Sequence, residues 1–171
     1  KFIDGAIKII KKTMSMFIVD GIKYQKLGDE FYYAQECFED QELYGYLSSN
    51  MIENKEDKSI YTHTVYDSTI EENFAKAFNE NSNVKLFTKL PSWFKINTPL
   101  GTYNPDWAVL IEKDNEEKLY FVVESKGSDL GLDIKTAESS KIECAKKHFA
   151  EISAKVDLVQ SNNFSNLRNH I

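Results

Sequence analysis

Two strongly apolar segments, residues 103–112 and 118–127, are joined only by the charged turn KDNEE. A connection this short makes the two segments antiparallel neighbours in one sheet. Within the second segment, residues 119–123 (LYFVV) are apolar at every position, as expected of a strand that is covered on both faces. This pair therefore predicts a buried sheet with layers packed on both sides.

The segments around this pair have helical or extended patterns. Ser68 and Glu71 form the S-x-x-E pattern of a capping box at the start of an apolar-periodic segment, which predicts a helix. The order helix, three or four strands, helix, strand predicts an α/β core with a central mixed β-sheet flanked by helices (α-β-β-β-α-β). Besides the apolar pair, the predicted elements are helices over 67–80 and 138–155 and strands over 84–90, 93–96 and 156–160.

The chain before this core is expected to form an N-terminal β/α appendage, residues 1–66, that packs on the core at 67–171. It opens with an amphipathic segment whose apolar residues recur at helical spacing. Residues 16–27, MFIVDGIKYQKL, predict two short strands around an Asp-Gly turn. Residues 30–38 predict a further strand.

The composition is that of a globular domain rather than a disordered or membrane-spanning chain. Hydrophobic residues make up 42% and charged residues 28% of the 171 residues. No apolar run approaches the roughly 20 residues that span a bilayer, and no signal peptide is recognisable. The two cysteines are far apart in the sequence, so we expect free thiols in a reducing cytoplasm.

The net charge of −6 argues mildly against a nucleic-acid partner, but its distribution changes that interpretation. Residues 29–57 alone carry −8, so the remainder of the chain carries +2. A near-neutral body with one acidic lobe can still present a basic face to a polyanion.

Three ionisable residues stand at the margins of the apolar pair. Asp106 opens the first strand, and Glu124 and Lys126 end the second. Glu124 and Lys126 are two residues apart and share a sheet face, and antiparallel pairing brings the start of one strand beside the end of the next. We therefore expect all three side chains to converge. The simpler alternative is a turn residue at Asp106 and an ion pair of small energetic value between Glu124 and Lys126.

This arrangement suits the hydrolysis of a phosphodiester. Two carboxylates offer Mg²⁺ the hard oxygen ligands that it prefers, and a bound metal relieves their mutual repulsion. The metal would polarise a phosphoryl oxygen and lower the pKa of a bound water. Lys126 would orient that water and offset charge in the transition state.

Two further residues are candidates for the same site. Glu71 lies inside or beside the apolar face of its predicted helix, so it can ligate the metal or its water, although the capping box alone also explains a glutamate there. Lys141, at the border of the apolar face of the later helix, can contact a DNA phosphate, with a solvated lysine as the simpler alternative.

Pro105-Asp106 with Glu124-Ser125-Lys126 resembles the signature of the PD-(D/E)XK nuclease superfamily. The wider sequence is similar to the C-terminal endonuclease domain of the Res subunit of type III restriction enzymes. The similarity extends from residue 17 to about residue 160. The stretches that carry it are YDSTIEENFA, VKLFTKLPSWFKINTPLGTYNPDWAVLIEK, LYFVVESKG and KIECAKKHFA, together with GIKYQKLGDEFYYAQECF and ELYGYL before them.

The resemblance implies that Asp106, Glu124 and Lys126 are cleavage residues and that Glu71 is the helix glutamate of the superfamily. It also implies double-stranded DNA as substrate, an ATP-dependent motor in the full subunit, and a methyltransferase (Mod) subunit that reads the DNA sequence. The chain itself has no G-x-x-x-x-G-K-[ST] motif, so we expect it to be part of a larger enzyme whose ATP is bound elsewhere. A repair or recombination nuclease of the same superfamily, or a non-catalytic docking module, are the alternatives.

Overall fold

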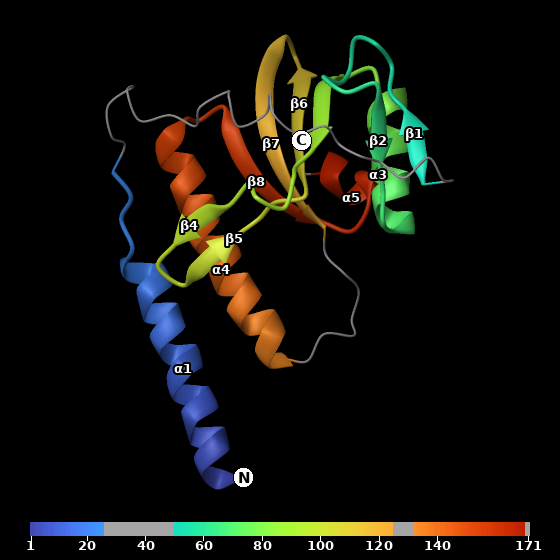
Figure 1. Cartoon of the computed structure of the whole chain (residues 1–171). Coiled ribbons are helices and arrows are strands. Elements are labelled where there is room, and N and C mark those ends of the chain that lie inside the picture. The colour runs from blue at the N-terminus through green and yellow to red at the C-terminus, as the bar shows by residue number, and fades with distance from the viewer. Residues whose placement is uncertain (26–49, 125–131, 170–171) are drawn as a thin grey trace.

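The computed structural model describes residues 1–25, 50–124 and 132–169, with only the backbone at 123–124 and 132–138. Its centre is a four-stranded sheet in the order β3-β6-β7-β8 (Figure 1). These strands are β3 (Val84–Lys89), β6 (Trp107–Lys113), β7 (Glu116–Glu124) and β8 (Val156–Ser161).

The sheet is mixed. β6 pairs antiparallel with both β3 and β7, whereas β8 runs parallel to β7. The turn between β6 and β7 has positive φ at Asp114 (54°) and Asn115 (64°), as a two-residue hairpin turn of type I′ requires. Parallel pairing of β7 with β8 needs a crossover, which α4 (Leu132–Ile152) supplies.

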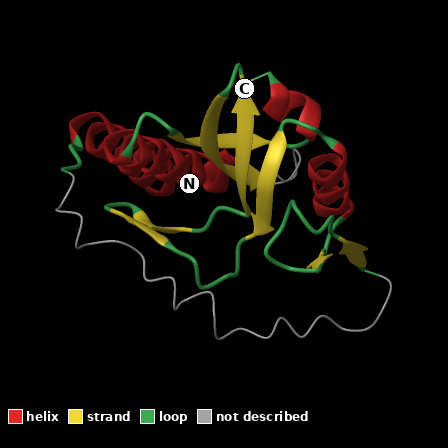
Figure 2. Ribbon diagram, turned by 90° about the horizontal axis from the view of Figure 1, so that it is seen from above, coloured by secondary structure: helices red, strands yellow, loops and turns green. Residues whose placement is uncertain are grey.

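Helices cover both faces of the sheet (Figure 2). On one face, α3 (Thr69–Glu80) buries Phe74 and Phe78 against Trp107, and α5 (Phe164–Arg168) lies beside it. On the other face, Phe149 of α4 stacks on Phe121 of β7, with ring centroids 4.5 Å apart. The prediction of an α/β fold with a mixed sheet flanked by helices is therefore confirmed, in the core order α3-β3-β6-β7-α4-β8.

Two small hairpins accompany this core. β1 (Met51–Glu53) pairs with β2 (His63–Val65) next to α3, and β4 (Ile96–Thr98) pairs with β5 (Gly101–Tyr103) next to α4. The strand expected at 93–96 instead begins at Ile96, because Pro91 to Phe94 form a turn closed by the Phe94 N–H to Pro91 O hydrogen bond, 3.0 Å.

The hairpin predicted over residues 16–27 is wrong where the structure describes it. Residues Phe2–Gly21 form one continuous helix, α1, and the chain becomes extended at Ile22. Met14 and Phe17 continue the apolar stripe of the first turns at helical spacing, so the stripe outweighs the Asp-Gly turn signal, and that glycine ends the helix. Residues 26–27 and the strand expected at 30–38 lie outside the described residues.

α1 projects from the core and contacts α4 near its C-terminal end (Figure 1). There Lys147 of α4 donates a hydrogen bond to the Val19 carbonyl, and Tyr24 packs edge-on against His148 with centroids 5.1 Å apart. No residue of α1 is buried. The division of the chain into an appendage and a core at residue 66 stays a prediction. Within the described part of the chain, no helix is long and apolar enough to cross a bilayer.

Candidate active site

Asp106 lies at a bend directly before β6, between two neighbouring strands. Its N–H donates to the carbonyl of Val122 in β7 (2.9 Å), and its carbonyl accepts from the Leu90 N–H, directly after β3 (2.8 Å). Trp107, not Asp106, is the residue paired with Val122 in the strand register. Asp106 is thus tied to both neighbouring segments directly before the β6–β7 register begins.

Asp106 lies at a bend outside β6, so the alternation of side chains within the strand does not decide which sheet face its side chain takes.

Glu124 is the last residue of β7, and its backbone pairs with Ser161 of β8. The antiparallel register confirms that the start of β6 adjoins the end of β7, as the short turn predicted. The side chain of Glu124 and all of Ser125 and Lys126 lie outside the described residues. Convergence of the three side chains stays a prediction.

Glu71 is placed by the N-terminus of α3. Ser68 is the N-cap, and its Oγ accepts a hydrogen bond from the Glu71 N–H (3.1 Å), as the capping box predicted. The Glu71 carboxylate accepts from the Asp67 N–H (2.6 Å), one residue earlier than in the standard box. With only 12% of its side chain exposed, Glu71 faces the protein rather than solvent.

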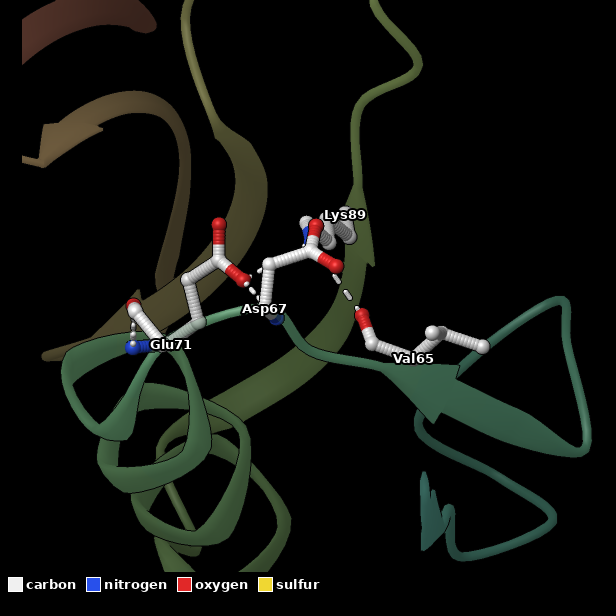
Figure 3. Close-up of polar contacts among 5 residues, drawn as sticks. Val65, Asp67, Glu71 and Lys89 are labelled. Atoms are coloured by element: carbon white, nitrogen blue, oxygen red, sulfur yellow. Dashed lines mark hydrogen bonds and ion pairs between the residues drawn. The ribbon is translucent and has the colours of Figure 1, made fainter. Parts of the chain in front are cut away.

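The partner that sequence reasoning missed is Lys89, the last residue of β3. Its Nζ lies 2.8 Å from Glu71 Oε2, 3.2 Å from Asp67 Oδ2 and 3.2 Å from the Val65 carbonyl oxygen (Figure 3). Burial lowers the pKa of Lys89, but hydrogen bonds and charges from Glu71 and Asp67 outweigh burial, so its pKa is raised overall. One signal was available in the sequence: Lys89 is two residues after the buried Phe87 and so shares its sheet face.

The group formed by Lys89, Glu71 and Asp67 is linked to Asp106 through the backbone. Lys89 pairs with Trp107 across β3 and β6, and the next residue, Leu90, bonds to Asp106. Glu71 is therefore held by an ion pair one strand away from Asp106. Among the residues that are fully described, no three metal-ligating side chains lie close enough to hold an ion.

The predicted metal ligands nevertheless fit Mg²⁺ in their chemistry. Asp106, Glu71 and Glu124 are all carboxylates, the hard oxygen donors that this ion takes, and one or two of them suffice because Mg²⁺ keeps several waters. The described contacts of the Glu71 carboxylate all use Oε2. Glu71 Oε1 accepts no hydrogen bond from the described residues.

Lys141 of α4 lies on the other side of the sheet. Its Nζ is exposed and within 3.4 Å of the Thr102 carbonyl in β5. The structure thus places Lys141 beside the β4–β5 hairpin rather than with Lys89 and Glu71. A contact of Lys141 with DNA stays a prediction.

A mixed sheet flanked by helices is compatible with a restriction-endonuclease-like fold. The chain belongs to the endonuclease domain family, which matches residues 57–165. It is also similar to two curated proteins, the Type III restriction-modification enzyme EcoPI Res subunit of Escherichia phage P1 and the EcoP15I Res subunit of Escherichia coli. Each is 30% identical over 112 residues, 64% of this chain.

The matched region is 11% of the length of each relative, so the chain corresponds to a small part of those subunits. No solved structure matches the chain. The chain is thus an endonuclease domain related to the Res subunits of type III restriction enzymes, as the sequence resemblance indicated.

Proposed function

We propose that this chain is the Mg²⁺-dependent DNA endonuclease domain of a type III restriction-modification system. It would hydrolyse DNA phosphodiester bonds, with cleavage licensed by an ATP-dependent motor outside this sequence. The observation that carries the proposal is the position of Asp106, at a bend beside the end of the strand that contains Glu124. Membership of the endonuclease domain family supports it.

In this proposal each side chain has a defined task. Asp106 and Glu124 would hold the metal, and Glu71 would bind it or position one of its waters. Polarisation of the phosphoryl oxygen and a lowered water pKa are the chemistry that Mg²⁺ supplies when bound. Lys126 would orient the attacking water and offset the negative charge that grows on the phosphate.

The partners follow from the same proposal. Double-stranded DNA is the substrate, and a methyltransferase (Mod) subunit supplies sequence recognition. Lys141 would contact a phosphate of the DNA. A cytoplasmic location belongs to the proposal because the DNA and the reducing environment expected for the cysteines are both there. The two Res subunits among the relatives favour restriction over repair or a docking module.

The decisive experiment replaces Asp106 or Lys126 by alanine in the full enzyme assembly. We expect each variant to lose DNA cleavage by at least about 100-fold, because each removes a group that acts on the reacting phosphate. ATP hydrolysis should be unchanged, since the motor lies outside this chain. Cleavage at the wild-type rate in both variants would refute the assignment.

A further inference from the structure

Lys89 connects three segments at one end of the sheet. Its ammonium group bonds to the N-terminal turn of α3 through Glu71, to the preceding Asp67, and to the carbonyl of Val65 at the end of β2 (Figure 3). The three acceptors use the three donors that a lysine ammonium has. Its side chain is 25% exposed, so this cation is largely withdrawn from water.

The described hydrogen bonds to the Glu71 carboxylate all go to one of its two oxygens. Oε2 accepts from both Lys89 (2.8 Å) and the Asp67 N–H (2.6 Å). Two donors on one oxygen fix the plane and direction of the carboxylate. Oε1 then keeps a set direction while accepting nothing from the residues that the structure describes.

The same end of β3 also fixes Asp106. The Leu90 N–H, one residue after Lys89, donates to the Asp106 carbonyl (2.8 Å). Lys89 itself is in register with Trp107. The last residue of β3 and the residue after it therefore hold the carboxylate of Glu71 and the backbone of Asp106.

We propose that Lys89 is a positioning residue that orients Glu71 toward the metal site at Asp106. The inference rests on the proposed function, because it assigns Glu71 and Asp106 to one metal site. Lys89 does not touch the substrate in this proposal; it acts through Glu71. Ligand-orienting partners of this kind typically contribute about 10–100-fold in metal affinity or activity.

Mn²⁺ binding to the 171-residue chain tests the proposal directly. The ion has the same preference for oxygen ligands as Mg²⁺, and its free form is measured by electron paramagnetic resonance. We expect Lys89→Met to weaken Mn²⁺ binding about 10–100-fold. Lys89→Arg, which keeps the charge and the donors, should recover most of the affinity.

The matched control is Lys76→Met, which removes another ion pair between a lysine and a glutamate of α3. Lys76 pairs with Glu72 of α3 at 2.6 Å, but its side chain is 54% exposed, and the pair lies on the helix surface. Loss of this pair should leave Mn²⁺ affinity unchanged. A thermal unfolding curve for each variant separates loss of affinity from loss of fold, and Lys89→Gln replaces Lys89→Met if the methionine variant is unfolded.

A double-mutant cycle with Glu71→Gln shows whether Lys89 acts through Glu71. We expect the double variant Lys89→Met/Glu71→Gln to bind Mn²⁺ as weakly as Glu71→Gln alone, since the two residues act as a unit. Unchanged Mn²⁺ affinity in folded Lys89→Met, or fully independent losses in the cycle, would overturn the inference.

Asp106→Ala distinguishes a failure of the positioning role of Lys89 from a failure of the proposed metal site. If this variant loses Mn²⁺ binding and Lys89→Met does not, the positioning role is wrong and the metal site stands. If Asp106→Ala binds like the wild-type chain, or if the wild-type chain binds no Mn²⁺, the proposed metal site and the role of Lys89 both fail.

Discussion

At the scale of single residues, the site depends on local hydrogen bonds that place a few carboxylates. Hydrogen bonds with Leu90 and Val122 hold the backbone of Asp106, and hydrogen bonds from Lys89 and the Asp67 N–H hold the side chain of Glu71. Ser68 stabilises the first turn of α3, and that turn presents Glu71. A substitution at the cap should therefore affect stability and the site together.

We expect Ser68→Ala to lower the free energy of unfolding by about 1 kcal/mol, the usual cost of losing an N-cap side chain. The reason is that the Glu71 N–H loses its acceptor at 3.1 Å. Urea unfolding measures the change. Ser68→Asn, which retains a capping oxygen, is the control, and equal stability of Ser68→Ala and the wild-type chain would contradict the prediction.

The residue scale also shows what sequence reasoning could reach. Asp106 and Glu71 are recognisable because their signals are local: a residue at a strand margin and a four-residue capping pattern. The pairing of Lys89 with Glu71 spans 18 residues and depends on how β3 meets α3. Most lysines in strands are solvated, so the amino-acid sequence alone did not identify Lys89 as the partner of Glu71.

At the scale of elements, strong apolar patterns predicted the core and competing signals caused the main error. β6 and β7 follow from two apolar runs and a short turn, and their register confirms them. The hairpin expected after residue 15 is wrong because a helical stripe of apolar residues passes through that segment. The hydrogen bonds that tie the Asp106 backbone to Leu90 and Val122 have no sequence signal, because they depend on how neighbouring segments meet.

The contact between α4 and the segment after α1 should depend on pH. His148 of α4 packs against Tyr24, and burial lowers the pKa of His148 below its ordinary value. Its neutral form is therefore favoured in the folded chain, so stability is fully present above the ordinary histidine pKa of about 6.5. It is lost as the pH falls through the lower folded pKa.

We expect the urea midpoint to fall between about pH 7 and pH 5, and His148→Gln to reduce that fall, because it removes the group that must take up a proton. Urea unfolding followed by tyrosine fluorescence at both pH values measures this. His63→Gln, at an exposed position of β2, is the matched control. An identical pH dependence in wild-type chain and His148→Gln would show that His148 does not contribute.

At the scale of the whole molecule, α1 differs from every other described helix in having no buried residue. Its apolar stripe stays in water: Phe2 is 89%, Ile3 71%, Ile9 68% and Phe17 71% exposed. Contiguous apolar surface of this kind promotes association in solution. The core, by contrast, buries both faces of its sheet.

We expect the chain to self-associate with increasing concentration, as measured by sedimentation velocity. Ile9→Gln combined with Phe17→Gln should shift the sedimentation coefficient toward the monomer and leave the melting temperature within a few degrees, because neither side chain is buried. Leu158→Ala in the core is the contrasting variant and should lower the free energy of unfolding by about 2–5 kcal/mol. A concentration-independent wild-type sedimentation coefficient would contradict the expectation.

The dual attachment of Asp106 limits how freely the sheet can be altered. The Asp106 N–H donates to the Val122 carbonyl in β7, and the Asp106 carbonyl accepts from the Leu90 N–H after β3. Two neighbouring segments therefore fix the backbone of this aspartate. A displacement of about 1 Å can cost a reacting centre 100-fold in rate. Under the proposed function, substitutions that shift either anchor of Asp106 should therefore reduce DNA cleavage before they reduce stability.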